Sequence, residues 1–246
     1  MNKIKLMHFI PLNGAFEYAR RRLNEEQQYN IDYLGAYSFK EFYCNNEKTF
    51  ELNHEKKINH LSDDSSDFVV SFKDTEQDWR DISKYKNYTI QNNIEKPDIL
   101  TSVPPCSSIA MLNRGNRSGD ADSANWILEA VKFYLATDAK VLVFENAPGL
   151  VGREGLKILN RIKSILKFNN SDDKINIIKT TTLVHGIPQL RNRTFCYIYK
   201  SNKQKVFKNI KHDIKKLSDF LMSLNIPKNY DSKIDELHFS SSKNKV

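Results

Sequence analysis

Residues 97–106 read Pro-Asp-Ile-Leu-Thr-Ser-Val-Pro-Pro-Cys, and residues 140–149 read Lys-Val-Leu-Val-Phe-Glu-Asn-Ala-Pro-Gly. Each block holds a short apolar run, which is typical of a strand buried inside a sheet. Two prolines end the first run, because proline cannot donate a hydrogen bond to a sheet ladder. If the two strands are parallel and adjacent, Cys106 and Glu145 meet at the edge where open α/β sheets bind ligands.

A third block, Gly-Ile-Pro-Gln-Leu-Arg-Asn-Arg-Thr-Phe at residues 186–195, precedes another apolar run. If this stretch is extended, Arg191 and Arg193 point the same way and aim a fork of donors at one spot. Each feature also has an ordinary structural interpretation. A free cysteine is most often a small buried hydrophobe, and an acidic residue after a strand is often a helix cap. A catalytic role for Cys106 is therefore indicated only because the other two blocks are also present in the sequence.

The composition indicates a soluble chain with a sizeable core. At 246 residues, with 39% hydrophobic and 28% charged residues, the chain can form one large domain. No stretch is long and apolar enough to span a bilayer, and the first residues lack a signal-peptide core. The cysteines Cys44, Cys106 and Cys196 are widely spaced, which argues against a disulfide framework or a metal site. We therefore expect a cytoplasmic protein with no membrane partner.

The charge is concentrated near the C-terminus. We expect one domain over residues 1–200 and a basic extension over residues 201–246. The formal net charge is +8, and residues 200–246 carry +6 of it, with eleven lysines against five acidic residues. Such a bias can bind phosphates or a partner, or it can belong to a solvated, loosely folded end. Both interpretations stay open.

Strand and helix patterns alternate along the chain. A strand at residues 5–10, a turn and a helix from residue 16 form the usual cradle of nucleotide-like cofactors, because free N–H groups of the helix point at the ligand. Further apolar patterns predict helices at residues 126–135 and 156–166 and strands at residues 175–178 and 195–199. The alternation indicates an α/β fold with a mainly parallel sheet.

The three blocks, taken together, resemble those of the DNA (cytosine-5)-methyltransferases. They stand in the family's order as Pro105-Cys106, Glu145-Asn146-Ala147 and the run from Gln189 to Arg193. The resemblance implies a Rossmann-like S-adenosylmethionine-dependent methyltransferase fold. It also implies transfer of a methyl group from S-adenosylmethionine to carbon 5 of cytosine in DNA, within a restriction-modification system.

The resemblance gives four residues a place in the chemistry. Cys106 would be the nucleophile that adds to carbon 6 of cytosine. Glu145 would hydrogen-bond ring nitrogen 3, and Arg191 or Arg193 would hold the exocyclic oxygen. A stacked base cannot be reached in this way, so the target would be flipped out of double-stranded DNA.

The resemblance also assigns the cofactor site, to Phe9, Gly14, Glu41, Phe42, Asp78 and Pro105. The family's Phe-x-Gly-x-Gly block corresponds to the run from Phe9 to Gly14, with Pro11 and Asn13 at the glycine positions. Glu41 would accept hydrogen bonds from the ribose hydroxyls, and Phe42 would pack on adenine. Asp78 is the best match among several aspartates for the one that contacts the adenine amino group.

Contacts to DNA are expected from Arg114 and Arg117, which lie in a polar loop with two glycines, and from Gln189. A flexible linker is the alternative interpretation of that loop. Relatives continue beyond residue 200 with a recognition domain and two further blocks, where this chain has 46 residues.

Two explanations fit a catalytic half without a recognition domain. The first is a split enzyme whose second subunit carries that domain. The second is a catalytically inactive relative that binds DNA or regulates. A cysteine hydrolase ranks lower, because only His185 lies near a block as a candidate base.

Overall fold

The computed structural model describes residues 3–12, 14–27, 29–40, 58–71, 76–105 and 125–200, and residues 213, 216, 217 and 219. The chain forms two compact units. One contains residues 1–180 and 192–208, and the other contains residues 181–191 and 209–246. Five predicted site residues lie outside the described residues: Cys106, Glu41, Phe42, Arg114 and Arg117.

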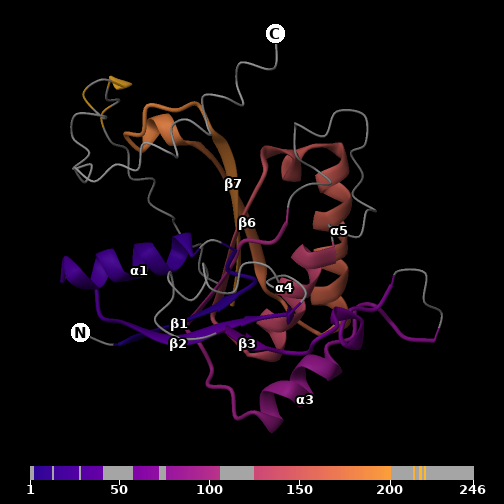
Figure 1. Cartoon of the computed structure of the whole chain (residues 1–246). Coiled ribbons are helices and arrows are strands. Elements are labelled where there is room, and N and C mark those ends of the chain that lie inside the picture. The colour runs from indigo at the N-terminus through magenta and orange to yellow at the C-terminus, as the bar shows by residue number, and fades with distance from the viewer. Residues whose placement is uncertain are drawn as a thin grey trace, which may run out of the picture. The chain divides into compact units, whose positions relative to one another are not determined.

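The first unit is built on a sheet that has seven strands within the described residues, in the order β3-β2-β1-β4-β5-β7-β6 (Figure 1). The strands are β1 (Ile4–Phe9), β2 (Ile31–Ser38), β3 (Ile58–His60), β4 (Ile99–Ser102), β5 (Val141–Asn146), β6 (Lys174–Thr181) and β7 (Asn192–Tyr199). Neighbours from β3 to β5 are parallel, whereas β7 runs antiparallel to β5. The predicted α/β fold with a mainly parallel sheet is confirmed.

Helices cover both faces of this sheet. They are α1 (Ala15–Glu25), α3 (Ser83–Gln91), α4 (Asn125–Ala136) and α5 (Arg153–Phe168), with short 3₁₀ turns η2 (Ser65–Asp67), η4 (Pro148–Val151) and η5 (Thr182–Val184). Figure 1 shows α1 on one side of the sheet and α3 on the other. α4 packs against both α3 and α5. The predicted helices are present, but β3 and α3 were not predicted, because residues 55–96 lack a clear apolar period.

The main core lies between the sheet and α3, α4 and α5. Phe9 of β1 is fully buried and stacks on Phe133 of α4, with ring centroids 4.6 Å apart. Tyr85 of α3 meets the same Phe9 ring edge-on. Along α4 the apolar residues at helical spacing are buried, as predicted. This packing fixes the strands so that β1, β4 and β5 end at one edge of the sheet.

Gly155 lets α5 begin directly against the turn that follows β5. A β-carbon at this position would collide with the carbonyl oxygens of Gly149 and Leu150. The close approach therefore fixes the chain just after Glu145 and Asn146.

Candidate active site

The carboxyl ends of the parallel strands define the candidate site. β4 and β5 are neighbours in register, with Ser102 opposite Phe144. Because β7 is antiparallel, its beginning meets the end of β5, and Glu145 lies opposite Phe195. The strand order also reverses between β1 and β4, and ligands of open α/β sheets bind in the crevice at that point. The end of β4, the end of β5 and the beginning of β7 therefore lie at the edge that the fold makes available to a ligand.

Glu145 and Arg193 form an ion pair at this edge. The Nε of Arg193 lies 2.5 Å from Oε1 of Glu145. The Glu145 side chain is 22% exposed and that of Arg193 is 27% exposed, so the pair is partly shielded but accessible. One Arg193 terminal nitrogen also donates to the carbonyl of Asn192 at 2.8 Å. The pairing places a carboxylate and a guanidinium where one small polar ring could contact both.

Asn146 ties the Pro-Pro turn to the end of β5. Its side-chain amide donates to the carbonyl oxygen of Pro104 at 3.2 Å, and its Oδ1 accepts from the backbone N–H of Ala147 at 2.9 Å. Asn146 is 1% exposed, so both bonds form away from water. The bond to Pro104 holds the turn that contains Pro105 beside the strand that carries Glu145. Asn146 belongs to the second sequence block, but its hydrogen bond to Pro104 was not predicted from the sequence.

The loop after β1 has the backbone of a glycine-rich turn. Positive φ angles occur at Ile10 (49°), Leu12 (49°) and Gly14 (77°). The left-handed region favours glycine, so the glycine-type positions are Leu12 and Gly14. Each of them directly follows one of the two positions, Pro11 and Asn13, that the resemblance aligns with the family's glycines, and Asn13 lies outside the described residues.

The start of α1 offers unshared donors to a polar ligand. Gly14 is the N-cap residue, and among the described residues no side chain caps the helix. The first bond of the helix runs from the Tyr18 N–H to the Gly14 carbonyl at 2.9 Å, so the three N–H groups between them point out of the helix. Such a helix end attracts anionic and polar groups. The backbone here fits the polar end of a cofactor.

Two predicted cofactor residues have side chains that are engaged within the protein. Phe9 is the last residue of β1, and its ring is 0% exposed because it packs in the aromatic core against Phe133. Asp78 is bound by its neighbour Arg80, whose hydrogen bond lowers the pKa of Asp78 to about 2. The Arg80 guanidinium lies 4.6 Å from the ring centroid of Phe168, at the end of α5. Since α5 starts near the carboxyl edge, Asp78 lies toward the opposite edge and does not fit an adenine contact.

The second unit holds the other arginine of the third block in a compact loop. Thr182 N–H donates to the carbonyl of Arg191 at 3.1 Å, and Arg191 N–H donates to the Thr182 hydroxyl oxygen at 3.1 Å. Thr182 also contacts the carbonyl oxygen of Gln189. Leu190, between them, is 75% exposed. Only Arg193 lies in a strand, so the stretch is not extended throughout and the two arginines belong to different units.

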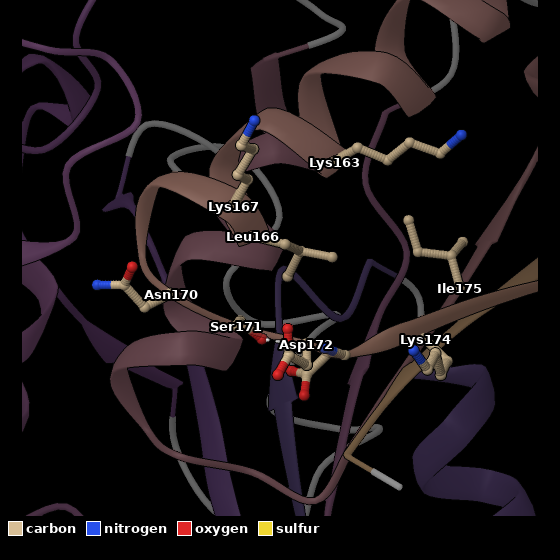
Figure 2. A pocket seen from close by; sticks show the side chains of 9 residues that line it. Lys163, Leu166, Lys167, Asn170, Ser171, Asp172, Lys174 and Ile175 are labelled. Atoms are coloured by element: carbon tan, nitrogen blue, oxygen red, sulfur yellow. Dashed lines mark hydrogen bonds between the residues drawn. The ribbon is translucent and has the colours of Figure 1, made fainter. Parts of the chain in front are cut away.

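An open hollow of about 730 Å³ lies at the opposite edge of the sheet. It is lined by Lys163, Lys167, Lys174 and the loop between α5 and β6. Figure 2 shows these three lysine side chains pointing in different directions. A neighbouring hollow of about 390 Å³ includes Asp138 and Lys200, which flank the beginning of β5. Neither hollow is lined by residues at the carboxyl ends of β4 and β5.

Within the described ranges, no helix is both long and apolar enough to cross a membrane. Over the same residues, no group of three acidic, histidine or cysteine side chains is arranged to hold a metal ion.

The strand order, the reversed β7 and the polar edge define an α/β methyltransferase fold. The chain belongs to the C-5 cytosine-specific DNA methylase family, whose model matches residues 48–246. That match does not include β1, α1 or the loop between them. A comparison with curated protein sequences found no significant match.

Solved structures share the fold at low sequence identity. A protein described as a DNA modification methyltransferase of an E. coli prophage is 16% identical, with a TM-score of 0.52, over 80% of this chain and 47% of that one. The Entamoeba histolytica methyltransferase EhMeth is 15% identical, with a TM-score of 0.55, over 92% of this chain and 62% of that one. The chain therefore spans about half to three-fifths of the length of these relatives.

Proposed function

We propose that this chain is the catalytic part of an enzyme that transfers a methyl group from S-adenosylmethionine to carbon 5 of cytosine in double-stranded DNA. The observation that carries the proposal is the Glu145–Arg193 pair, which lies beside the Pro-Pro turn that Asn146 holds. Membership of the C-5 cytosine-specific family supports the same reaction.

Cys106 is the proposed nucleophile. Carbon 5 of cytosine is a poor nucleophile, so a group must first add at carbon 6 and push electron density toward carbon 5. A thiolate suits this step because sulfur is strongly nucleophilic. After methylation, loss of the carbon 5 proton to a base regenerates the ring double bond and expels the thiolate. Pro105 precedes Cys106, and the bond from Asn146 to Pro104 supports the position of this turn.

Glu145 is proposed to hydrogen-bond ring nitrogen 3 of the base. Addition of the thiolate builds negative charge on the ring, and a proton shared between Glu145 and nitrogen 3 stabilises that charge. Glu145 is therefore expected to be at least partly protonated while it acts on the base.

Arg193 is proposed to donate a hydrogen bond to the exocyclic oxygen of cytosine while its guanidinium stays paired with Glu145. A guanidinium has five N–H donors and can contact two acceptors at once. Preorganised donors of this kind stabilise charge that develops in the transition state. Arg191 remains a candidate for the same oxygen or for a neighbouring phosphate.

S-adenosylmethionine supplies the methyl group. Gly14 and the uncapped start of α1 would hold its polar end, and Pro105 would lie against it. Glu41 and Phe42 are the proposed contacts to ribose and adenine.

DNA would present a flipped base to the edge of the sheet. Arg114, Arg117 and Gln189 are the proposed contacts to DNA. The basic segment 201–246 would add sequence-independent attraction to phosphates. A second subunit that carries a recognition domain is a further proposed partner.

A second candidate is an inactive relative that binds DNA without transferring a methyl group. It is favoured by one observation: Leu12 and Ile10 occupy left-handed backbone positions in the cofactor loop. Side chains there restrict close approach of a ligand to the backbone.

Two measurements on the purified chain separate the candidates. Calorimetry with S-adenosylmethionine tests the cofactor site, and transfer of radioactive methyl groups to DNA tests the reaction, each with and without a candidate partner that carries a recognition domain. The enzyme is supported if the wild-type chain binds S-adenosylmethionine and transfers methyl groups, and if Cys106→Ser keeps the binding but loses the transfer. The absence of transfer under both conditions supports the inactive relative.

A further inference from the structure

The face of the sheet under α1 carries a buried polar cluster. His8 of β1 and Glu17 of α1 are 0% exposed, Arg20 of α1 is 6% exposed, and Thr101 of β4 is 4% exposed. These four residues are called the α1 clamp below. Buried charged side chains are rare unless they are paired, and the chemistry proposed above uses none of the four.

The α1 clamp is a continuous chain of hydrogen bonds. Arg20 donates to both oxygens of Glu17, at 2.9 and 2.7 Å. His8 places Nε2 at 3.4 Å from Glu17 Oε2 and Nδ1 at 2.5 Å from the Thr101 hydroxyl oxygen. A carboxylate can only accept, so Nε2 carries the hydrogen, and the Thr101 hydroxyl then donates to Nδ1. One tautomer of His8 therefore satisfies every group.

The charges agree with that tautomer. Burial lowers the pKa of His8 from its ordinary value, against the opposing effect of Glu17. Burial by itself would raise the pKa of Glu17, but hydrogen bonds from His8 and Arg20 lower it overall. Tyr33 of β2 faces the same group, with its ring centroid 5.1 Å from that of His8 and 5.4 Å from the Arg20 guanidinium. At neutral pH the clamp thus holds a neutral histidine, a carboxylate and a guanidinium.

The clamp joins three segments that matter for the site. His8 lies two residues before the loop of residues 10–14, and Glu17 lies three residues after it. Thr101 belongs to β4, five residues before Cys106. The two bonds of His8 therefore connect both ends of the cofactor loop to the strand that leads to the nucleophile.

Two backbone bonds join the same segments at the edge itself. Ile10 N–H donates to the Tyr37 carbonyl at 2.9 Å, and Val103 N–H donates to the Ile10 carbonyl at 3.0 Å. These bonds lie beyond the last residues of β1 and β4 and depend on the strands beneath them staying in place. Their amide hydrogens report directly on that connection.

We propose that His8 and Thr101 are positioning residues, which hold the loop of residues 10–14 and the end of β4 at a fixed separation so that the methyl donor and Cys106 reach the same base. The catalytic consequence rests on the proposed function. The connection between the loop and the strand is a property of the fold that can be measured without activity.

Thr101→Val removes the hydroxyl that contacts His8 while keeping the shape of the side chain, and Thr101→Ser keeps the hydroxyl. Tyr85→Phe is the matched control, because Tyr85 is 1% exposed and donates to Glu129 at 2.7 Å in the core on the other face of the sheet. Thr101→Val and Tyr85→Phe are each expected to lose one buried hydrogen bond.

Hydrogen exchange of the Ile10 and Val103 amides is the first readout. Thr101→Val is expected to speed both about tenfold relative to Tyr85→Phe, and Thr101→Ser is expected to restore them. In the active enzyme, Thr101→Val is expected to raise the KM for S-adenosylmethionine about tenfold, with a smaller change in kcat.

Equal exchange of these amides in Thr101→Val and Tyr85→Phe would overturn the proposal and leave the clamp a purely structural cluster. If wild-type protein transfers no methyl groups with or without a candidate partner, the proposed function fails, and the exchange measurement still decides the inference. Should Thr101→Val not fold, nitrogen NMR of His8 in the wild-type chain decides: the neutral Nε2–H tautomer is expected, and a ring protonated at Nδ1 contradicts the clamp.

Discussion

Arg193 at the beginning of β7 and Glu145 at the end of β5 meet across an antiparallel strand pair, 2.5 Å apart. The pair is formed by residues 48 positions apart in the chain, and the reversed direction of β7 brings them together. A parallel β7 would have placed Arg193 at the opposite edge of the sheet. The reversed direction of β7 relative to β5 therefore brings a carboxylate and an arginine together at this edge.

Glu145→Gln and Arg193→Ala should affect activity far more than stability. A partly exposed ion pair contributes about 0–1 kcal/mol to the free energy of unfolding. Loss of an acid group or of an electrostatic clamp lowers the rate about 10²- to 10⁴-fold. Methyl transfer rates and thermal unfolding of both single variants and the double variant measure this, since contacting residues are not additive. Stability losses that account for the lost activity would contradict the assigned roles.

Asn146→Ala should loosen the turn that precedes Cys106. It leaves the Pro104 carbonyl and the Ala147 N–H without their side-chain partner, which costs about 1–3 kcal/mol of unfolding free energy. We also expect slower reaction of Cys106. Asn169→Ala is the control, because the Asn169 amide donates to the Arg80 and Ile165 carbonyls near the other edge. A similar slowing in Asn169→Ala would argue against a specific role for Asn146.

Leu12→Gly should increase the affinity of the chain for S-adenosylmethionine. Leu12 has a φ of 49°, which an L-residue adopts at a cost of about 1–2 kcal/mol, while glycine loses about 0.5–1 kcal/mol in chain entropy. The net change in stability is therefore small. Gln27→Gly, at a φ of 53°, is the matched control for this backbone effect. Calorimetry should show tighter binding of S-adenosylmethionine only in Leu12→Gly, and equal affinities in both variants would show that Leu12 does not restrict the site.

Stability should fall as the pH drops below about 6.5, because His8 is buried as a neutral ring. Its pKa in the folded state is lower than in the unfolded state, so the unfolded chain binds more protons in acid. The slope contributed by this group is at most about 1.4 kcal/mol per pH unit. Glu17 and Arg20 from α1, Tyr33 from β2 and Thr101 from β4 are the groups that face it.

Denaturant unfolding of wild type and His8→Gln from pH 7 to pH 5 measures the His8 contribution, since the other histidines are common to both proteins. A shallower slope is expected in the variant. Identical slopes would mean that His8 takes up its proton without cost in the folded state.

Cys196 should resist thiol reagents in the native protein. It is 0% exposed on β7, and burial raises the pKa of its thiol far above the ordinary value. Mass spectrometry after brief treatment with iodoacetamide should find Cys196 unmodified, and denatured protein should react there. If iodoacetamide modified Cys196 in the native protein, Cys196 would be a second candidate for the residue that forms a covalent adduct.

Much of the sheet edge that carries the candidate site was predictable from the sequence, because each of its strands is a short apolar run bounded by polar residues. The blocks at residues 97–106 and 140–149 became β4 and β5, and their parallel pairing follows from the helix between them. The direction of β7 was not predicted, since an apolar run carries no information about which way a strand runs.

The residues that sequence reasoning missed depend on contacts between distant segments. His8 interrupts the apolar β1, which signals a buried polar group, but its partners Glu17 and Thr101 are set by tertiary packing. Asp78 was misplaced because motif matching in a polar stretch had no period to anchor it. The left-handed backbone at Ile10 and Leu12 was not predicted, because these residue types do not favour it.

Trapping a covalent adduct tests the central claim most directly. The purified chain, with and without a candidate partner subunit, is incubated with DNA that contains 5-fluorocytosine and with S-adenosylmethionine; the fluorine cannot leave as a proton does, so the thiolate stays attached. The account predicts a denaturation-resistant protein–DNA complex whose linked peptide contains Cys106, absent in Cys106→Ser and strongly reduced in Glu145→Gln. No complex under either condition, or one that persists in Cys106→Ser, would contradict it.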